Sequence, residues 1–326
     1  MNQEYENFEV LIIDDCGNDN SYSIAIEYAQ KDSRIKVLKN DCNRGIAYTR
    51  NRGISEFKGE FIALLDDDDI IVGQRIKEQV EFLVANEDFG AVGGNAQWID
   101  SNGNLVRDTI ELVYDENEIR MWMCFRNIFN NSEMMFRKSV VINNGIFYQD
   151  NYYGLEDYKF WTDLLKCSKI TNLPNTYLKK RVINENETSR SRRLFAGHRD
   201  CIYHSIQEDF LSSCGFVLNN RMRQVLRVFF SEEKAINFGF TELSEIQYFT
   251  LELLRQANVN NIVFKDKLTN WFVSLFKDNI SCVLKDFDSE IIDIYGNVDN
   301  GISCFICKDK DLAEQERIRQ EHISYI

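Results

Sequence analysis

Short apolar runs alternate with helical patterns through the N-terminal third of this chain. The runs at residues 8–13, 34–38 and 61–65 have the length and composition of strands that are buried on both faces of a sheet. A segment with helical spacing follows each run, at residues 21–31, 45–57 and 74–86. This alternation predicts an α/β fold in which helices cover both faces of a mostly parallel sheet.

The pattern of apolar residues in the sequence changes near residue 190. Before that point, residues 91–94 and 133–136 are predicted to be strands, and residues 157–166 are predicted to be an aromatic-rich helix. After it, helical patterns dominate, at residues 199–211, 221–230 and 243–256. We therefore expect an α/β domain over residues 1–190 and a mainly α-helical accessory region over residues 191–326.

The composition limits the classes of partner. General nucleic-acid binding needs a basic surface, and the formal net charge is -14, so we expect no nucleic-acid partner. The nine cysteines lack the spacing of a disulfide framework, which predicts a reduced, cytoplasmic protein. Cys304 and Cys307 lie in residues 282–307, where short strands are expected, and are interpreted as core residues rather than redox or metal ligands. No run approaches the roughly 18 apolar residues of a membrane span.

Two of the predicted strands end in acidic residues. Asp14 and Asp15 follow the first strand, and Asp66 to Asp69 follow the third. The carboxyl ends of parallel strands meet at one edge of a sheet, where open α/β folds bind ligands. Clustered carboxylates suit Mg²⁺ or Mn²⁺, and those ions suit diphosphates. One cluster would hold a base or ribose and the other a metal-bound diphosphate; the alternatives are a solvated acidic turn at Asp66–Asp69 and helix capping at Asp14–Asp15.

Two further groups of charged residues precede predicted helices. Gly45 permits close backbone approach at a helix start, where a phosphate is favoured, and Arg50 could reach a diphosphate there. For Arg44 and Arg52 we favour pairing with surface acids. The carboxylate of Asp157 could act as a general base, or it could complement the dipole of the helix that it begins.

The order of these motifs resembles that of the family 2 inverting glycosyltransferases, which have the GT-A fold. The resemblance covers about residues 5 to 190. The chain up to about residue 215 is also similar to the bacterial lipooligosaccharide and capsule branch of the family. It is carried by Asp14-Asp15-Cys16-Gly17-Asn18, Asn43-Arg44-Gly45, Arg50-Asn51-x-Gly53, residues 59–69, Asn127, residues 135–139, Glu156-Asp157-Tyr158-x-Phe160-Trp161 and residues 185–189.

The resemblance implies a role for each acidic position. Asp15 would contact the nucleobase, usually uracil. Asp66-Asp67-Asp68 overlies the family's DxD motif, in which Asp68 would ligate the divalent metal while Asp66 and Asp67 contact ribose, donor sugar or metal. Asp157 would deprotonate the acceptor hydroxyl, which attacks the anomeric carbon and inverts its configuration.

The same resemblance implies the substrates and the cofactor. The donor would be a nucleotide-sugar, UDP-linked in most relatives, and the acceptor a hydroxyl of a cell-surface glycan in polysaccharide biosynthesis. The cofactor would be Mn²⁺ or Mg²⁺. A lipid-linked acceptor would imply a peripheral position at the inner face of the membrane.

The sequence departs from the family pattern at several places. The family begins with a strand, a loop and a helix for which this chain has no counterpart before Gln3, so we expect Met1 to be an internal methionine or a boundary. Asn184 stands where relatives often have a histidine that completes the metal site, which makes it a weaker ligand. Asn131 likewise stands for histidine, and Ile128 and Gly73 stand for proline.

These departures keep two other functions open. The first is a degenerate, non-catalytic relative that serves as a binding or assembly module. The second is a metal-dependent phosphohydrolase or nucleotidyltransferase that uses Asp66 to Asp69. Transfer or hydrolysis of a UDP-sugar with Mn²⁺ that Asp157→Asn abolishes would discriminate against the module, and phosphate release without a glycosyl acceptor would favour the hydrolase.

Overall fold

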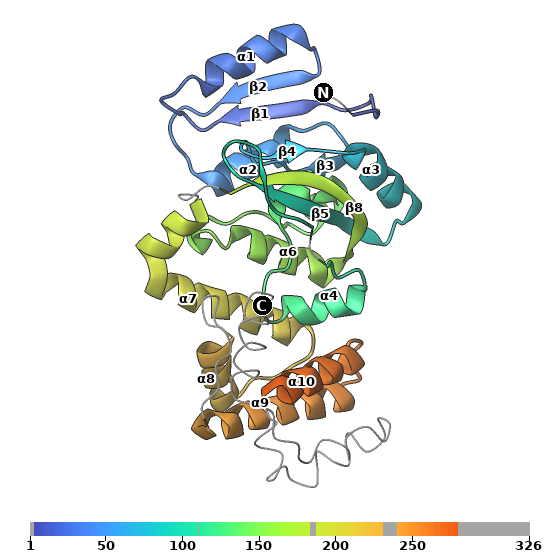
Figure 1. Cartoon of the computed structure of the whole chain (residues 1–326), viewed down its shortest axis with the longest axis vertical. Coiled ribbons are helices and arrows are strands. Elements are labelled where there is room, and N and C mark those ends of the chain that lie inside the picture. The colour runs from blue at the N-terminus through green and yellow to red at the C-terminus, as the bar shows by residue number, and fades with distance from the viewer. Residues whose placement is uncertain (1–2, 110, 183–186, 231–239, 280–326) are drawn as a thin grey trace. The chain divides into compact units, whose positions relative to one another are not determined.

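The chain divides into two compact units, residues 1–210 and residues 211–326. The computed structural model describes residues 3–109, 111–182, 187–230 and 240–279 (Figure 1). The domain boundary expected at residue 190 stays a prediction.

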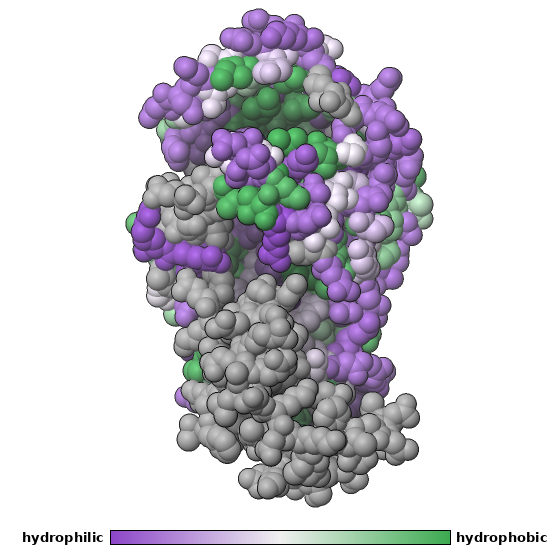
Figure 2. Space-filling model, in the orientation of Figure 1, coloured by the Kyte–Doolittle hydropathy of each residue, from purple (hydrophilic) through white to green (hydrophobic). Residues whose placement is uncertain are grey.

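The first unit begins with a two-stranded parallel sheet, β1 (Val10–Asp14) and β2 (Ile35–Lys39), which is flanked by α1 (Ser21–Lys31) and α2 (Ile46–Glu56). In the described part of the chain β1 pairs only with β2. Every residue of β1 is partly exposed, although a parallel strand is ordinarily buried on both faces. Figure 2 accordingly shows apolar surface over this sheet.

A second, larger sheet carries the rest of the first unit. In the described residues its path is β3-β7-β5-β8-β4, with β6 also paired to β5. The strands are β3 (Phe61–Ala63), β4 (Ile70–Ile71), β5 (Phe89–Ile99), β6 (Leu105–Arg107), β7 (Met135–Arg137) and β8 (Lys169–Arg181).

The strand directions differ from those expected. Among the neighbouring strands described in the larger sheet, β5 and β8 pair in parallel and the other pairs are antiparallel. The antiparallel strand β7 lies between β3 and β5, so the sheet is mixed rather than mostly parallel. The α/β class itself is confirmed.

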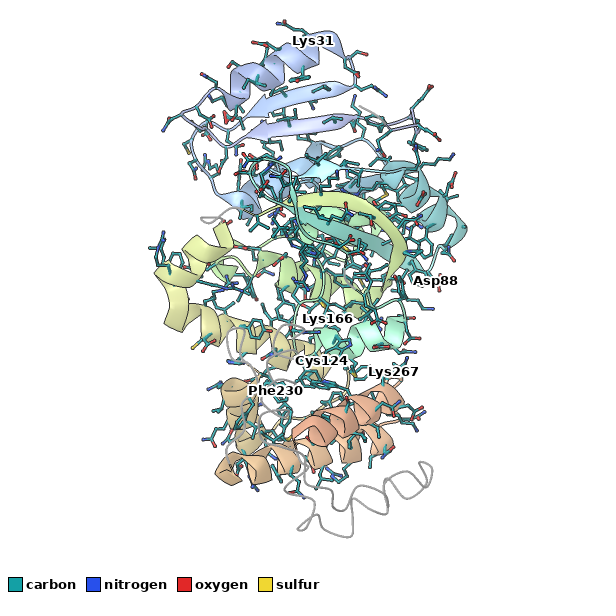
Figure 3. The ribbon with its side chains drawn as sticks, in the orientation of Figure 1. Lys31, Asp88, Cys124, Lys166, Phe230 and Lys267 are labelled. Atoms are coloured by element: carbon teal, nitrogen blue, oxygen red, sulfur yellow. The ribbon has the colours of Figure 1, made fainter. Side chains whose placement is uncertain are left out.

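Helices cover this sheet and supply the core. Besides α1 and α2, the first unit up to β8 contains α3 (Arg75–Ala85), α4 (Glu116–Met123), α5 (Lys138–Asn143) and α6 (Glu156–Cys167). Helix α6 buries Tyr158, Phe160, Trp161, Thr162 and Leu164, which point to several sides of the helix, so other elements cover it on more than one face. Side chains pack densely around β5 and β8, with Asp88 just ahead of β5 (Figure 3).

The predicted helices beyond residue 190 are confirmed where the structure describes them. They are α7 (Glu187–Ser213), which crosses the boundary between the units, α8 (Asn220–Phe229), α9 (Phe240–Val259) and α10 (Lys265–Asn279). On the basic side of α8, the exposed Arg221 pairs with Glu245 of α9 at 2.7 Å. No described helix is both long enough and apolar enough to cross a bilayer. Residues 282–307, with Cys304 and Cys307, lie outside the described residues.

Candidate functional site

Asp66 to Asp69 form a turn, here called the acidic turn, between β3 and β4. The backbone amide of Asp69 donates to the carbonyl of Asp66 at 3.2 Å, which closes the turn. The backbone amide of Asp66 donates to the Ser132 hydroxyl at 3.0 Å. Ser132 is fully buried in the 3₁₀ turn ahead of β7, so the acidic turn is anchored to the larger sheet.

Two carboxylates of the acidic turn are costly to ionise as they stand. Burial, together with the charges of Asp69, Asp66 and Asp67, raises the pKa of Asp68. Burial also raises the pKa of Asp69, although the backbone amide of Arg181 donates to its Oδ1 at 3.0 Å. The other oxygen, Asp69 Oδ2, is buried without a hydrogen-bond partner. A cation bound here would favour the ionised form of both carboxylates and so lower their pKa values.

Arg50 links the acidic turn to the first turn of α6. Its guanidinium contacts Asp66 Oδ1 at 3.1 Å and lies 5.3 Å from the ring centroid of Tyr148. The Arg50 side chain is 17% exposed, and its charge lowers the pKa of Asp157. That Arg50 reaches a diphosphate stays a prediction.

Asp157 lies in the first turn of α6 and is partly exposed. Its Oδ1 accepts from the Tyr158 backbone amide at 2.7 Å, and its Oδ2 accepts from Asn127 Nδ2 at 3.3 Å. Burial raises the pKa of Asp157, and Arg50 offsets part of that rise. A carboxylate with a raised pKa and some access to solvent has the properties of a general base.

The ring of Tyr148 lies beside the guanidinium of Arg50. This ring stacks on Phe160 with centroids 4.3 Å apart, and the Tyr148 hydroxyl donates to Asn131 Oδ1 at 3.3 Å. Asn51 clamps the Tyr148 backbone through two hydrogen bonds, at 2.7 and 2.9 Å. Arg50 and Asn51 are neighbours on α2, so this clamp fixes the part of the helix that presents Arg50.

The other acidic pair lies in a different sheet. The strands that lead to Asp15 and Asp66 were expected to share one sheet, whereas β1 and β3 belong to separate sheets in the described residues. Asp14 Oδ1 accepts from the Gly17 amide at 3.0 Å, and its Oδ2 faces Lys39 at 3.2 Å, as the turn-forming alternative predicts.

Asp15 joins β1 to the start of α2. Its carboxylate accepts from the backbone amides of Arg44 and Gly45, both at 2.8 Å, and from Asn40 Nδ2 at 2.6 Å. Burial raises the pKa of Asp15, but these hydrogen bonds together hold it below its usual value. Asp15 therefore stays ionised and shapes the loop at the start of α2.

Comparison with known proteins shows which family the chain resembles. Residues 1–145 match the model of glycosyl transferase family 2. This part of the chain is therefore similar to that family. An uncharacterized glycosyltransferase of Haemophilus influenzae is 30% identical over 196 residues, which cover 58% of this chain and 60% of that relative. The chain thus spans less than two thirds of that relative's length.

Two further similarities extend over more of the chain. The UDP-Glc:alpha-D-GlcNAc-diphosphoundecaprenol beta-1,3-glucosyltransferase WfaP of Escherichia coli is 28% identical over 233 residues, which cover 66% of this chain and 87% of WfaP. The crystal structure of S. aureus TarS 1-349 in complex with UDP-GlcNAc aligns with a TM-score of 0.50 at 17% identity, covering 83% of this chain and 85% of TarS. The predicted GT-A fold is confirmed.

The structure also tests the predicted pairing of Arg44 and Arg52, and only one of the two predictions is confirmed. Arg44 pairs with Asp41 at 2.8 Å, as expected. Arg52 was expected to pair with a surface acid, and this is wrong, because it donates to the Lys39 carbonyl at 2.9 Å and to an amide oxygen. Asn184 lies outside the described residues.

Three residues of the site were not predicted. Tyr148 comes from a loop, and Lys180 and Arg181 come from the end of β8, a strand that was not predicted either. The signal was the run of cations from Lys179 to Arg181, a short distance before Asn184. Pro174 interrupts the strand pattern ahead of it, at a register shift between β5 and β8.

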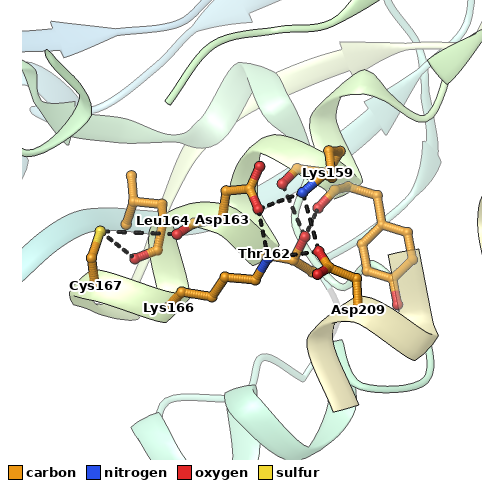
Figure 4. A network of polar contacts seen from close by, with 8 residues as sticks. Lys159, Thr162, Asp163, Leu164, Lys166, Cys167 and Asp209 are labelled. Atoms are coloured by element: carbon orange, nitrogen blue, oxygen red, sulfur yellow. Dashed lines mark hydrogen bonds and ion pairs between the residues drawn. The ribbon is translucent and has the colours of Figure 1, made fainter. Parts of the chain in front are cut away.

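The far part of α6 is fixed to α7 by four charged side chains. Lys159 contacts Asp163 at 2.5 Å and Asp209 at 3.2 Å, and Lys166 contacts the same two carboxylates at 2.9 and 2.6 Å (Figure 4). Only 13% of the Lys159 side chain is exposed, so solvent screens this network less than a surface pair. The network helps to hold the helix that presents Asp157.

We expect Asp163→Asn to lower the free energy of unfolding by about 1.5–3 kcal/mol, because it weakens two charge-assisted hydrogen bonds. Chemical denaturation followed by circular dichroism measures the change. Asp88→Asn is the matched control, since the Asp88–Lys169 pair lies at the surface and is expected to leave the midpoint almost unchanged. Equal midpoints for Asp163→Asn and the wild type would show that the network does not stabilise α6.

Proposed function

We propose that this protein is a family 2 glycosyltransferase that transfers a sugar, with inversion, from a UDP-sugar to a hydroxyl of a lipid-linked surface glycan. The observation that carries the proposal is the position of Arg50, which pairs with Asp66 and whose charge acts on Asp157. It couples an acidic turn suited to a cation and a diphosphate with a carboxylate suited to removing a proton. The donor and the acceptor in the name of WfaP support both the donor and the acceptor class.

The proposed reaction needs one proton acceptor and one site for the departing charge. Asp157 takes the proton of the acceptor hydroxyl, whose oxygen forms a bond to the anomeric carbon. The bond from that carbon to the diphosphate oxygen breaks, and its electron pair leaves with UDP. In-line attack from the opposite side inverts the configuration, and no covalent intermediate with the protein is required.

The end of β1, together with the loop that leads into α2, would hold the nucleoside. Asp14 and Asp15 would lie on the side of the base and ribose, and Arg50, Asp66 and Asp67 on the side of the diphosphate and sugar. The hydrogen bonds that Asp15 makes to the start of α2 give this loop a defined form for binding.

The acidic turn fits a divalent cation. Among the residues the structure describes, no three His, Cys, Asp or Glu side chains are already arranged around a metal position. The donor set is nevertheless suited to Mn²⁺ or Mg²⁺, because it offers hard carboxylate oxygens, the unpartnered Asp69 Oδ2 and a raised pKa at Asp68. Asp68 and Asp66 would hold the ion, with Asn184 as a weaker ligand. The bound ion would supply positive charge to the diphosphate.

We expect the purified protein to bind UDP in the presence of Mn²⁺ and to transfer sugar from a UDP-sugar donor. Asp68→Asn removes a charged ligand, so Mn²⁺ binding measured by electron paramagnetic resonance should weaken at least about tenfold. Asp41→Asn, on an exposed side chain paired with Arg44, is the control. The absence of UDP binding by the wild type would contradict the proposed function, and release of phosphate without an acceptor would favour a hydrolase.

A peripheral position at the inner face of the membrane belongs to the same proposal, because a lipid-linked acceptor must be reached there. Co-sedimentation of the full chain with vesicles that contain a polyprenyl diphosphate-linked sugar would test it. Equal sedimentation with vesicles that lack this lipid would show that the acceptor does not recruit the protein.

A further inference from the structure

The acidic turn and Asp157 share a nearby cation on β8, Lys180. Strand β4 pairs antiparallel with β8, and Ile70 lies opposite Lys179. One step further along each strand, Asp69 comes beside Lys180. The Lys180 side chain, which is partly buried, reaches Asn130 Oδ1 at 3.2 Å.

The contacts of Lys180 leave most of its hydrogen-bonding capacity unused. An ammonium group has three donors, and in the described part of the chain Lys180 makes one hydrogen bond, to the neutral amide of Asn130, and no ion pair within 4.0 Å. Its charge nevertheless acts on Asp69, Glu133 and Asp157, because it lowers the pKa of each against the effect of their burial.

The neighbouring cations are committed to other partners. Arg50 is paired with Asp66. Arg75 is fully buried and donates to the backbone carbonyls of Leu64 and Met134. Arg181 donates to three further carbonyls, those of Asp68, Asp100 and Ser101.

We propose that Lys180 binds the diphosphate of the UDP-sugar and stabilises the negative charge that develops on it as the sugar is transferred. This inference rests on the proposed function, and it adds a protein cation to the divalent ion of the acidic turn. When the bond to the anomeric carbon breaks, the electron pair moves to the diphosphate oxygen. The unused N–H donors of Lys180 form charge-assisted hydrogen bonds there, which strengthen as that charge grows.

The test compares the affinity for UDP with the affinity for uridine. Isothermal titration calorimetry in the presence of Mn²⁺ should show Lys180→Met binding UDP about 10- to 100-fold more weakly than the wild type, which is the loss expected for one charge-assisted hydrogen bond. Uridine lacks the diphosphate, so its affinity should not change. Lys180→Arg keeps the charge and should recover part of the affinity for UDP.

The neighbouring lysine supplies the control. Lys179 is one residue away on β8, and alternate residues of a strand point to opposite faces, so Lys179→Met should bind UDP as the wild type does. An equal loss of UDP and uridine affinity in Lys180→Met would overturn the inference in favour of a structural role. Unchanged UDP affinity would also overturn it while leaving the proposed function standing. A wild type that binds no UDP would overturn both.

Discussion

Asp157→Asn is expected to lower kcat for sugar transfer by about 10²–10⁴-fold, the range that a general base contributes. The amide keeps the size of the side chain and one oxygen for the Tyr158 backbone amide, but it does not take up the acceptor proton. Among the described residues, Asp157 makes no hydrogen bond or ion pair with the acidic turn, so the affinity for UDP should change little. Initial rates with a UDP-sugar and a glycan acceptor, together with calorimetry for UDP, measure the two quantities.

Glu156→Gln provides the comparison at the adjacent position. Glu156 Oε1 accepts from the Gly154 backbone amide at 2.8 Å, a contact that the amide oxygen of glutamine keeps. We expect its activity to stay within a few-fold of the wild type. If Asp157→Asn kept wild-type kcat while Glu156→Gln lost activity, the base would be Glu156.

Arg50→Met is expected to lower activity at neutral pH by about 10- to 100-fold and to move the acid limb of the kcat/KM profile to higher pH. Burial raises the pKa of Asp157, Arg50 lowers it, Glu156 raises it, and Lys180 lowers it. Loss of Arg50 therefore leaves a higher pKa at Asp157. A base must be ionised to act, so the variant should regain activity as the pH rises.

Arg50→Lys separates the charge from the shape of the side chain. It keeps the positive charge and should leave the acid limb close to that of the wild type, although it loses the planar contact with Tyr148. Arg44→Met is the matched surface control, because Arg44 is exposed and pairs with Asp41. An acid limb at the same pH in Arg50→Met and the wild type would show that Arg50 does not control the ionisation of the base.

Local elements were predictable because local patterns determine them. The helix expected at residues 21–31 is α1, and the helix expected at residues 157–166 is α6 with one residue more at each end. Their apolar spacing needs no information from distant residues. Strand pairing does need it, and the position of β7 between β3 and β5 depends on contacts between segments far apart in the sequence.

In the candidate site too, some features follow from local sequence patterns and others depend on contacts between distant residues. The acidic turn follows an apolar strand, which is a local signal. The contact of Arg50 with Asp66, by contrast, depends on how α2 packs, and that packing includes the Asn51 clamp on Tyr148, 97 residues away. Lys180 was not predicted because Pro174 interrupts the sequence pattern of β8, the long strand that contains Lys180.

Within the described residues β1 pairs on one side only, and this affects how the isolated chain behaves at high concentration. Val10 to Ile13 form an uncharged aliphatic segment, and every residue of the strand keeps some exposure. A strand edge of this kind is a template for pairing with a second chain, and uncharged aliphatic strands are prone to aggregate. β1 is therefore the described strand from which we expect self-association of the purified protein to start.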